Sequence, residues 1–120
     1  MKNIASMGAA AVVLGACGAS GPVPADKLAQ SQAAVRSAQE LGAERVPPAA
    51  LHLKVANEQL NLARKLIADG DNKRAEYVLL RAEADAEVAL NLAREQAARE
   101  DAQRTIMQVQ QLKNSQPEGT

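Results

Sequence analysis

The segment from Asp71 to Lys113 contains neither proline nor glycine, and this uninterrupted run constrains the fold more than any other feature of the sequence. Its first half carries apolar residues at alternating steps of four and three, the spacing of one helical face: Ala75, Leu79, Ala82, Ala86, Ala89 and Ala93. At the rise of an α-helix, the predicted helix is about 65 Å long, against about 30 Å for the next longest. Its far end, from about Gln96, should therefore project beyond a bundle.

Two shorter helices are predicted upstream. They cover Asp26–Leu41 and Ala49–Asp69, and Gly42 and Gly70 follow them as helix terminators. Val46-Pro47-Pro48 forces an extended connection between the two, because each proline disfavours helical geometry at the preceding residue. The face of the first helix consists of Leu28, Ser31, Val35 and Ala38.

The second predicted helix carries two apolar lines. One consists of Leu53, Ala56, Leu60, Ala63 and Ile67, and the other of Leu51, Val55, Leu62 and Leu66. Together they cover roughly half of the circumference, more than one neighbouring helix can bury. We therefore expect this helix to lie between the other two in an all-α fold: an antiparallel three-helix bundle with two shorter helices and one long C-terminal helix.

The projecting end of the long helix has an apolar face of its own. It consists of Ala98, Ala102, Thr105, Val109 and Leu112, with Ile106 beside it. Glu95 with Arg99, and Glu100 with Arg104, are spaced as favourable i,i+4 ion pairs. The segment is either a solvated helix supported by local pairs, or a docking surface for a second copy or another envelope protein.

Composition excludes several classes of function. The chain has 14 Lys+Arg and 14 Asp+Glu residues, so its formal net charge is zero, and aromatic residues make up 1% of it. Nucleic-acid binding needs a basic footprint and usually rings for stacking, and an aromatic-lined ligand pocket needs rings as well. The single Cys and single His cannot assemble an ordinary zinc site. No nucleophile turn or phosphate loop occurs, so we expect no enzyme activity, cofactor, metal or evident small-molecule substrate.

His52 is the one imidazole, and it lies with Gln59 between the two apolar lines of the second helix. The sequence places no carboxylate beside it, so we interpret it as a partly buried histidine with a local hydrogen-bond partner. Glu83, Asp85 and Glu87 do not form an acidic site, because alternate residues of a helix point in different directions.

The N-terminus has the features of a secretory signal. Lys2 precedes the uncharged apolar stretch Ile4–Leu14, which is too short for a membrane span of roughly 20 apolar residues. Directly behind it, Leu14, Gly15, Ala16 and Cys17 resemble the lipobox of bacterial lipoproteins. The resemblance implies cleavage before Cys17, attachment of a diacylglyceryl group to its thiol, and acylation of the new amino terminus.

The same resemblance implies a location. Gly18 stands where an Asp would resemble an inner-membrane retention signal, so we expect a lipid anchor on the periplasmic face of the outer membrane. The predicted organisation is a signal peptide (1–16), the lipidated Cys and a tether (17–25), an alanine-rich helical domain (26–113) and a disordered tail (114–120).

The ordered part of the chain resembles domain-of-unknown-function family 4398, small alanine-rich helical proteins of the bacterial envelope. The matching landmarks are Pro24, Gly42-Ala43, Pro48, Gly70-Asp71 and Asp85-Ala86, with apolar residues between them. The resemblance implies a periplasmic, often lipid-anchored protein, and it transfers no catalytic residue.

These observations favour a non-enzymatic envelope lipoprotein that acts as a structural or docking module. The alternative is a tetratricopeptide-like adaptor that binds a partner helix or peptide between the last two helices. Such an adaptor should present an open, concave apolar groove lined by Leu51, Leu62, Val78 and Leu92.

Overall fold

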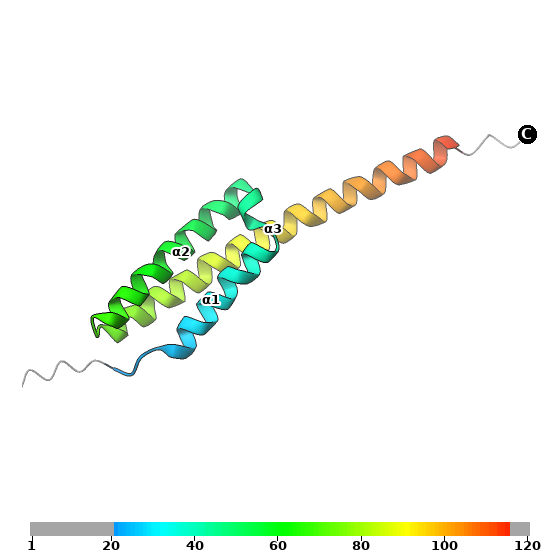
Figure 1. The fold of residues 1–120 in the computed structure, drawn as a ribbon. Coiled ribbons are helices and arrows are strands. Elements are labelled where there is room, and N and C mark those ends of the chain that lie inside the picture. Colours follow the sequence, from blue (N-terminus) through cyan, green and yellow to red (C-terminus); the bar gives the residue numbers. More distant parts are fainter. Residues whose placement is uncertain (1–20, 116–120) are drawn as a thin grey trace, which may run out of the picture.

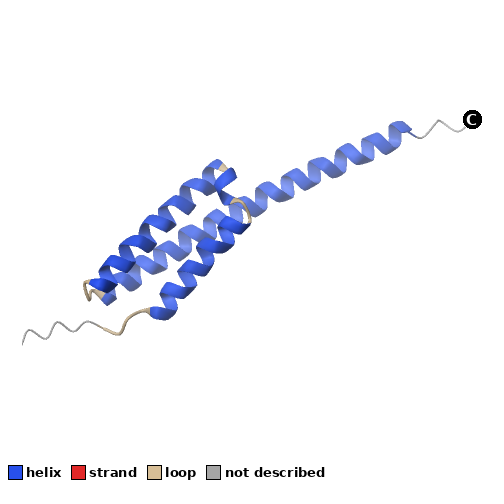
Figure 2. Ribbon diagram, in the orientation of Figure 1, coloured by secondary structure: helices blue, strands red, loops and turns tan. Residues whose placement is uncertain are grey.

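The structure is a computed structural model that describes residues 21–115. Its elements, in chain order, are α1 (Ala25–Glu40), the short 3-10 helix η1 (Ala43–Arg45), α2 (Pro47–Ala68) and α3 (Asn72–Ser115). Figure 1 shows α1 and α3 running in one direction, α2 running back between them in sequence, and α3 continuing beyond the other two. Residues 21–115 contain no strand (Figure 2). The predicted all-α antiparallel three-helix bundle with a long C-terminal helix is confirmed.

Glycine and proline set the connection between α1 and α2. Gly42 follows α1 in the left-handed conformation, with φ of 80°, and its N–H donates to the carbonyl of Gln39 at 2.9 Å. Val46 is extended, with φ −106° and ψ 106°, which is the geometry expected before a proline. The helix begins at Pro47, two residues earlier than predicted, because a proline fits the first helical position, where an N–H has no partner.

The turn between α2 and α3 ends α2 and begins α3. Gly70 is left-handed, with φ of 78°; its N–H donates to the carbonyl of Ile67, and the Asp71 N–H donates to that of Leu66 at 2.8 Å. This pair of bonds is a Schellman motif. Asp71 then caps α3, since its Oδ1 accepts the N–H of Arg74 at 3.3 Å. The role of Gly70 agrees with the sequence prediction.

The core is built mainly from alanines. All six residues of the predicted α3 seam are buried, as are Ala49, Leu53, Ala56, Leu60 and Ala63 of α2. Because an alanine side chain is a single methyl group, the helices approach closely. At one such approach Ser31 of α1 is fully buried, and its hydroxyl donates to the carbonyl of Leu79 in α3 at 2.9 Å.

The central helix is α3, and the prediction that the second helix lies between the other two is wrong. Helices α1 and α2 both pack mainly on α3 and contact each other much less. The small side chains of the α3 seam let both α1 and α2 pack on it, so much of the second apolar line of α2 faces solvent: Leu51 is 62% exposed and Leu62 is also exposed. At the end of α2 the core takes Leu66, whereas Ile67 is only half-buried.

The two ends of the domain lie far apart. At the base, the buried Asn72 donates from Nδ2 to the carbonyl of Gly21 at 2.6 Å, which fixes the start of the described chain beside the α2–α3 turn. At the other end, residues 97–115 of α3 are all exposed. We call residues 96–115 the arm; it is about 30 Å long. The arm includes Asn114 and Ser115, which the sequence had assigned to the tail.

Candidate functional site

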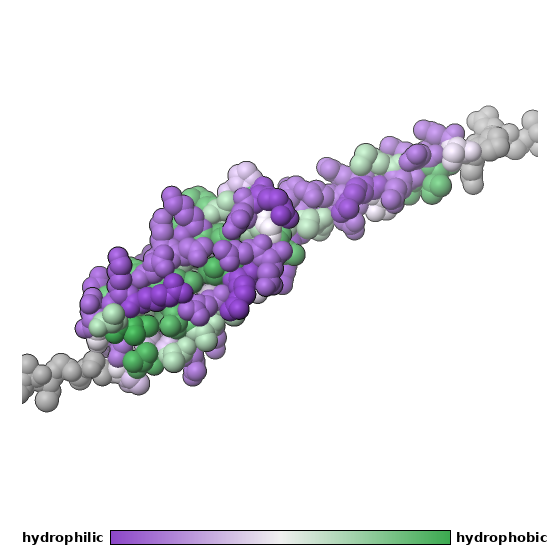
Figure 3. Space-filling view, viewed as in Figure 1, coloured by the Kyte–Doolittle hydropathy of each residue, from purple (hydrophilic) through white to green (hydrophobic). Residues whose placement is uncertain are grey.

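The predicted partner face lies on the arm. Ala98, Ala102, Ile106, Val109 and Leu112 are all exposed; Ile106 is 57% and Leu112 67% accessible. Figure 3 shows hydrophobic atoms near the far end of the arm among hydrophilic neighbours. No described part of the chain covers this face, because the bundle ends before it begins.

Local polar contacts support the arm, although one predicted pair is absent. Arg99 forms the expected ion pair with Glu95. Glu100 accepts instead from Gln96 Nε2 at 2.9 Å, and Arg104 pairs with Asp101 at 3.5 Å. The predicted Glu100–Arg104 ion pair is therefore wrong, because both groups have alternative partners within one helical turn. All these groups are solvated, so each contact stabilises the helix by only a few tenths of a kcal/mol, roughly 0.2–0.5.

A second surface lies between α2 and α3. A shallow depression of about 320 Å³ is lined by Val55, Glu58, Gln59, Leu62, Val78 and Arg81. Only Leu62 and Val78 of the four predicted groove residues contribute to it. Half of its lining is polar, so the surface differs from the continuous apolar groove that the adaptor hypothesis requires.

Next to this depression, His52 has a partner that the sequence analysis missed. Its Nδ1 lies 3.0 Å from Oδ1 of Asp85, and the other carboxylate oxygen accepts Nε2 of Gln59 at 2.9 Å. Because the carboxylate accepts, the imidazole Nδ1 is assigned as the donor. The expectation of a local hydrogen-bond partner for His52 is wrong: the neighbouring helix α3 brings Asp85 to it.

The His52–Asp85–Gln59 cluster links α2 to α3. Both carboxylate oxygens of Asp85 are occupied, and Gln59 Oε1 is buried without a hydrogen-bond partner in the described chain. Within residues 21–115, no hydroxyl bonds to the cluster, and no group of three or more His, Cys, Asp or Glu side chains is arranged to hold a metal. The cluster therefore fixes the register of two helices, and its members lack a neighbouring nucleophile.

A third hollow of about 300 Å³ marks the point where the arm leaves the bundle. It lies between the η1 connection, the first turn of α2 and α3, and its polar lining includes Arg45, Gln96 and Glu100. These side chains belong to exposed or half-buried residues, so the hollow is an open notch.

The lipobox residues Leu14, Gly15, Ala16 and Cys17 lie outside the described residues. Among the helices of the described chain, none is both long and apolar enough to cross a bilayer.

A comparison with protein families shows to which family the chain belongs. The family model for "Domain of unknown function (DUF4398)" matches residues 26–105, which include the first half of the arm and all of the bundle except Ala25. The chain belongs to the DUF4398 family. No curated protein and no solved structure matches it. The match confirms the resemblance to this family, and residues 26–105 are the part of the chain that the DUF4398 family model covers.

Proposed function

We propose that this DUF4398 protein is a non-enzymatic, lipid-anchored envelope protein whose arm binds a protein partner in the periplasm. The observation that carries the proposal is the arm itself. About 30 Å of helix contributes nothing to the core of its own domain, yet it bears Ile106, Val109 and Leu112 on its surface. Most of the stability of a helix in a protein comes from packing of its apolar face; the described chain supplies none for the arm, and a partner would supply it.

The anchor is proposed from the lipobox-like run that ends at Cys17. Two or more acyl chains hold a protein on a bilayer stably, whereas one gives only marginal binding at about 0.8 kcal/mol per buried CH₂. The proposed site is the outer membrane, with the domain on the periplasmic side. Wild-type protein should be recovered with outer-membrane vesicles and should incorporate a labelled fatty acid.

The test of the anchor is Cys17→Ala, with Ser20→Ala as the matched control. Cys17→Ala should lose the label and change electrophoretic mobility, while Ser20→Ala should behave as wild type. A Cys17→Ala protein that stays in the membrane fraction with unchanged mobility would contradict the anchor.

The docking role is tested by a photo-crosslinking amino acid at Ile106 in intact cells. Gln111 is the control, because it is also exposed on the arm but lies on roughly the opposite side of the helix. A discrete adduct from Ile106 and none from Gln111 is expected. Equal labelling from both sites, or none from either, would refute a specific docking face.

A second candidate is the adaptor role, because two of the expected groove residues, Leu62 and Val78, line the depression between α2 and α3. The same crosslinker placed at Leu62, which is exposed at the edge of this depression, distinguishes the adaptor role from docking through the arm. Adducts from Leu62 in place of Ile106 would support the adaptor.

A further inference from the structure

The exposed apolar side chains of α3 gather on one face of the helix, in one group on the bundle and another on the arm. Large exposed hydrophobic residues are Tyr77, Leu80, Val88, Ile106, Val109 and Leu112, with Met107 as the single exception on this helix. At about 100° per residue, the six fall within an arc of roughly 120°, on the side of α3 opposite the buried alanine seam. Because α1 and α2 both pack on that seam, the outer face stays free from the bundle to the end of the arm.

This outer face has a two-fold pattern. At the bundle end it presents Tyr77, Leu80 and Ala84, and at the arm end Thr105, Val109 and Leu112. The first set is spaced by steps of three and four, and the second by the same steps in reverse order. If two α3 helices lie antiparallel about a point between positions 94 and 95, then Tyr77 faces Leu112, Leu80 faces Val109, and Ala84 faces Thr105.

We propose that two copies of this chain pair through the outer faces of their α3 helices in this antiparallel register. The inference rests on the proposed docking function and names its partner as a second copy. The contact is isologous, as expected for a closed two-fold dimer. Each copy contributes its bundle-end patch to the arm-end patch of the other, so a single interface covers both.

The polar residues in the middle of the face favour the antiparallel orientation. In a parallel pair every position meets its own counterpart, so Glu87 would face Glu87 and Asn91 would face Asn91 of the second copy. In the antiparallel register, Glu87 lies opposite Ala102 and Asn91 lies opposite Ala98. Opposite a methyl group, a carboxylate can bend towards solvent, which avoids like-charge repulsion across the interface.

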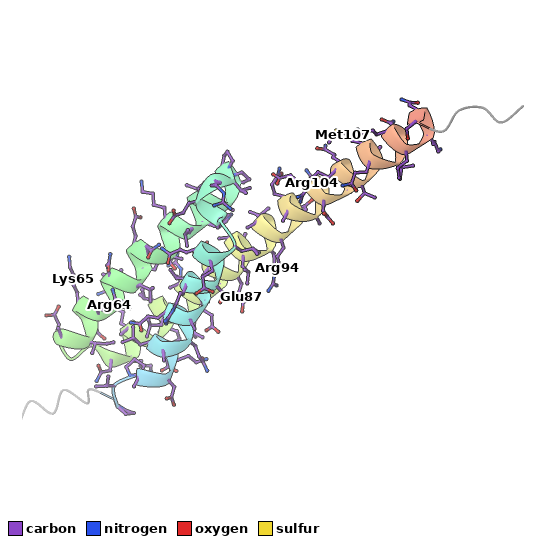
Figure 4. All side chains as sticks on the ribbon, turned by 45° about the vertical axis from the view of Figure 1, so that its right-hand side comes forward. Arg64, Lys65, Glu87, Arg94, Arg104 and Met107 are labelled. Atoms are coloured by element: carbon purple, nitrogen blue, oxygen red, sulfur yellow. The ribbon has the colours of Figure 1, made fainter. Side chains whose placement is uncertain are left out.

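Charged residues of both signs meet at the two-fold axis. Arg94 lies where α3 leaves the bundle (Figure 4), and the register places it opposite Glu95 of the second copy, although the two Arg94 side chains and the two Glu95 side chains also come near each other there. Each Glu95 already forms an ion pair with Arg99 of its own helix, and both groups are more than half exposed. Solvent and this internal pairing therefore reduce the repulsion at the axis.

The area fits a weak specific dimer. The contact from Tyr77 to Leu112 is about 52 Å long and a helix is about 10 Å wide, so each copy covers roughly 500 Å² and the pair roughly 1,000 Å². This is at the lower limit for a specific interface. An overlap confined to the two arms, each about 30 Å long, would bury only about 600 Å² in total, which is below the range of specific interfaces, and this is why the full-length register is the one proposed.

Disulfide trapping tests the register. In the otherwise complete chain with Cys17→Ser, Leu80→Cys and Val109→Cys variants are oxidised separately and as a mixture. The mixture should give at least about tenfold more linked dimer than either variant alone, because like positions lie about 44 Å apart in the antiparallel pair. Leu80→Cys mixed with Met107→Cys is the matched control: Met107 is 59% exposed on the same arm but off the face.

The outcomes are distinct. Efficient self-linking of Leu80→Cys would indicate a parallel pair and overturn the proposal, as would equal linking to Val109→Cys and Met107→Cys. Sedimentation equilibrium supplies an independent readout: Leu80→Lys and Val109→Glu should each lower the dimer fraction, and a mixture of the two should restore it. A monomer at all concentrations, together with an Ile106 adduct to a different protein in cells, would overturn this inference and leave the docking function intact.

Discussion

Leu79 offers the sharpest test of the alanine-rich core. It is the largest side chain that the bundle buries completely, and it lies in the α3 seam on which both other helices pack. Leu79→Ala removes three carbon atoms and leaves a cavity. The neighbouring seam residues Ala75 and Ala82 cannot move into it, since a methyl group on a helical backbone has no rotamer to change. We therefore expect a loss of about 3–5 kcal/mol in the free energy of unfolding.

Leu80→Ala is the matched control, one residue further along the same helix. Leu80 is 41% exposed, so its truncation should cost less than about 1 kcal/mol. A domain of this size is expected to have about 5–15 kcal/mol of stability in total. The Leu79 variant should thus lose about a fifth or more of it, and its melting temperature should fall by at least about 12 °C.

The assay is urea denaturation followed by circular dichroism at 222 nm, in chains that carry Cys17→Ser and at micromolar protein or below, so that pairing contributes little. The transition midpoint should fall strongly for Leu79→Ala and slightly for Leu80→Ala, with an unchanged slope. If Leu79→Ala does not fold, Leu79→Val, expected to cost about 1 kcal/mol, replaces it. Equal losses for the two positions would refute the reasoning that α3 is the central, closely packed helix.

Two further predictions concern α1 and the arm. Ser31→Ala should lower the free energy of unfolding by about 1 kcal/mol, because its buried hydroxyl bonds to the carbonyls of Leu79 in α3 and Lys27 in its own helix. Ser37→Ala is the control and should lower it by less than about 0.5 kcal/mol, because its exposed hydroxyl bonds only to Ala33. A similar loss for both variants in urea titrations would contradict this prediction. By hydrogen exchange at low protein concentration, amides of residues 97–115 should exchange much faster than those of residues 75–93, since only the latter lie in the packed bundle; uniform protection along α3 would show that the arm is covered in the monomer.

Periodicity predicted the helices and their faces, but it did not predict which helix is central. The seam from Ala75 to Ala93 is visible as steps of four and three, and all of it is buried. The two apolar lines of α2 suggested a helix with two neighbours, yet Leu51 and Leu62 are exposed. An apolar line shows that its burial would be favourable, but it does not show whether another helix packs on it. Here the small residues of α3 allow both α1 and α2 to pack closely on that helix.

The contact between His52 and Asp85 depends on a different kind of information. The two residues lie on separate helices, and neither local spacing nor composition connects them. One signal was present: they stand at comparable distances along the chain on either side of Gly70, and in an antiparallel helical hairpin such positions face each other. Asp85 also interrupts an apolar border of the α3 seam, which indicates a polar partner on the facing helix.

The two proposals together determine how the protein would lie on a membrane. In the antiparallel pair the two bases, each marked by Asn72 and the Gly21 that it binds, are about 68 Å apart at opposite ends. From Cys17 to Gly21 the chain reaches at most about 14 Å. Both anchors can therefore enter one leaflet only if the paired α3 helices lie along the bilayer surface. An upright orientation would lift the second anchor out of the membrane, so lipid attachment and pairing together select the flat orientation.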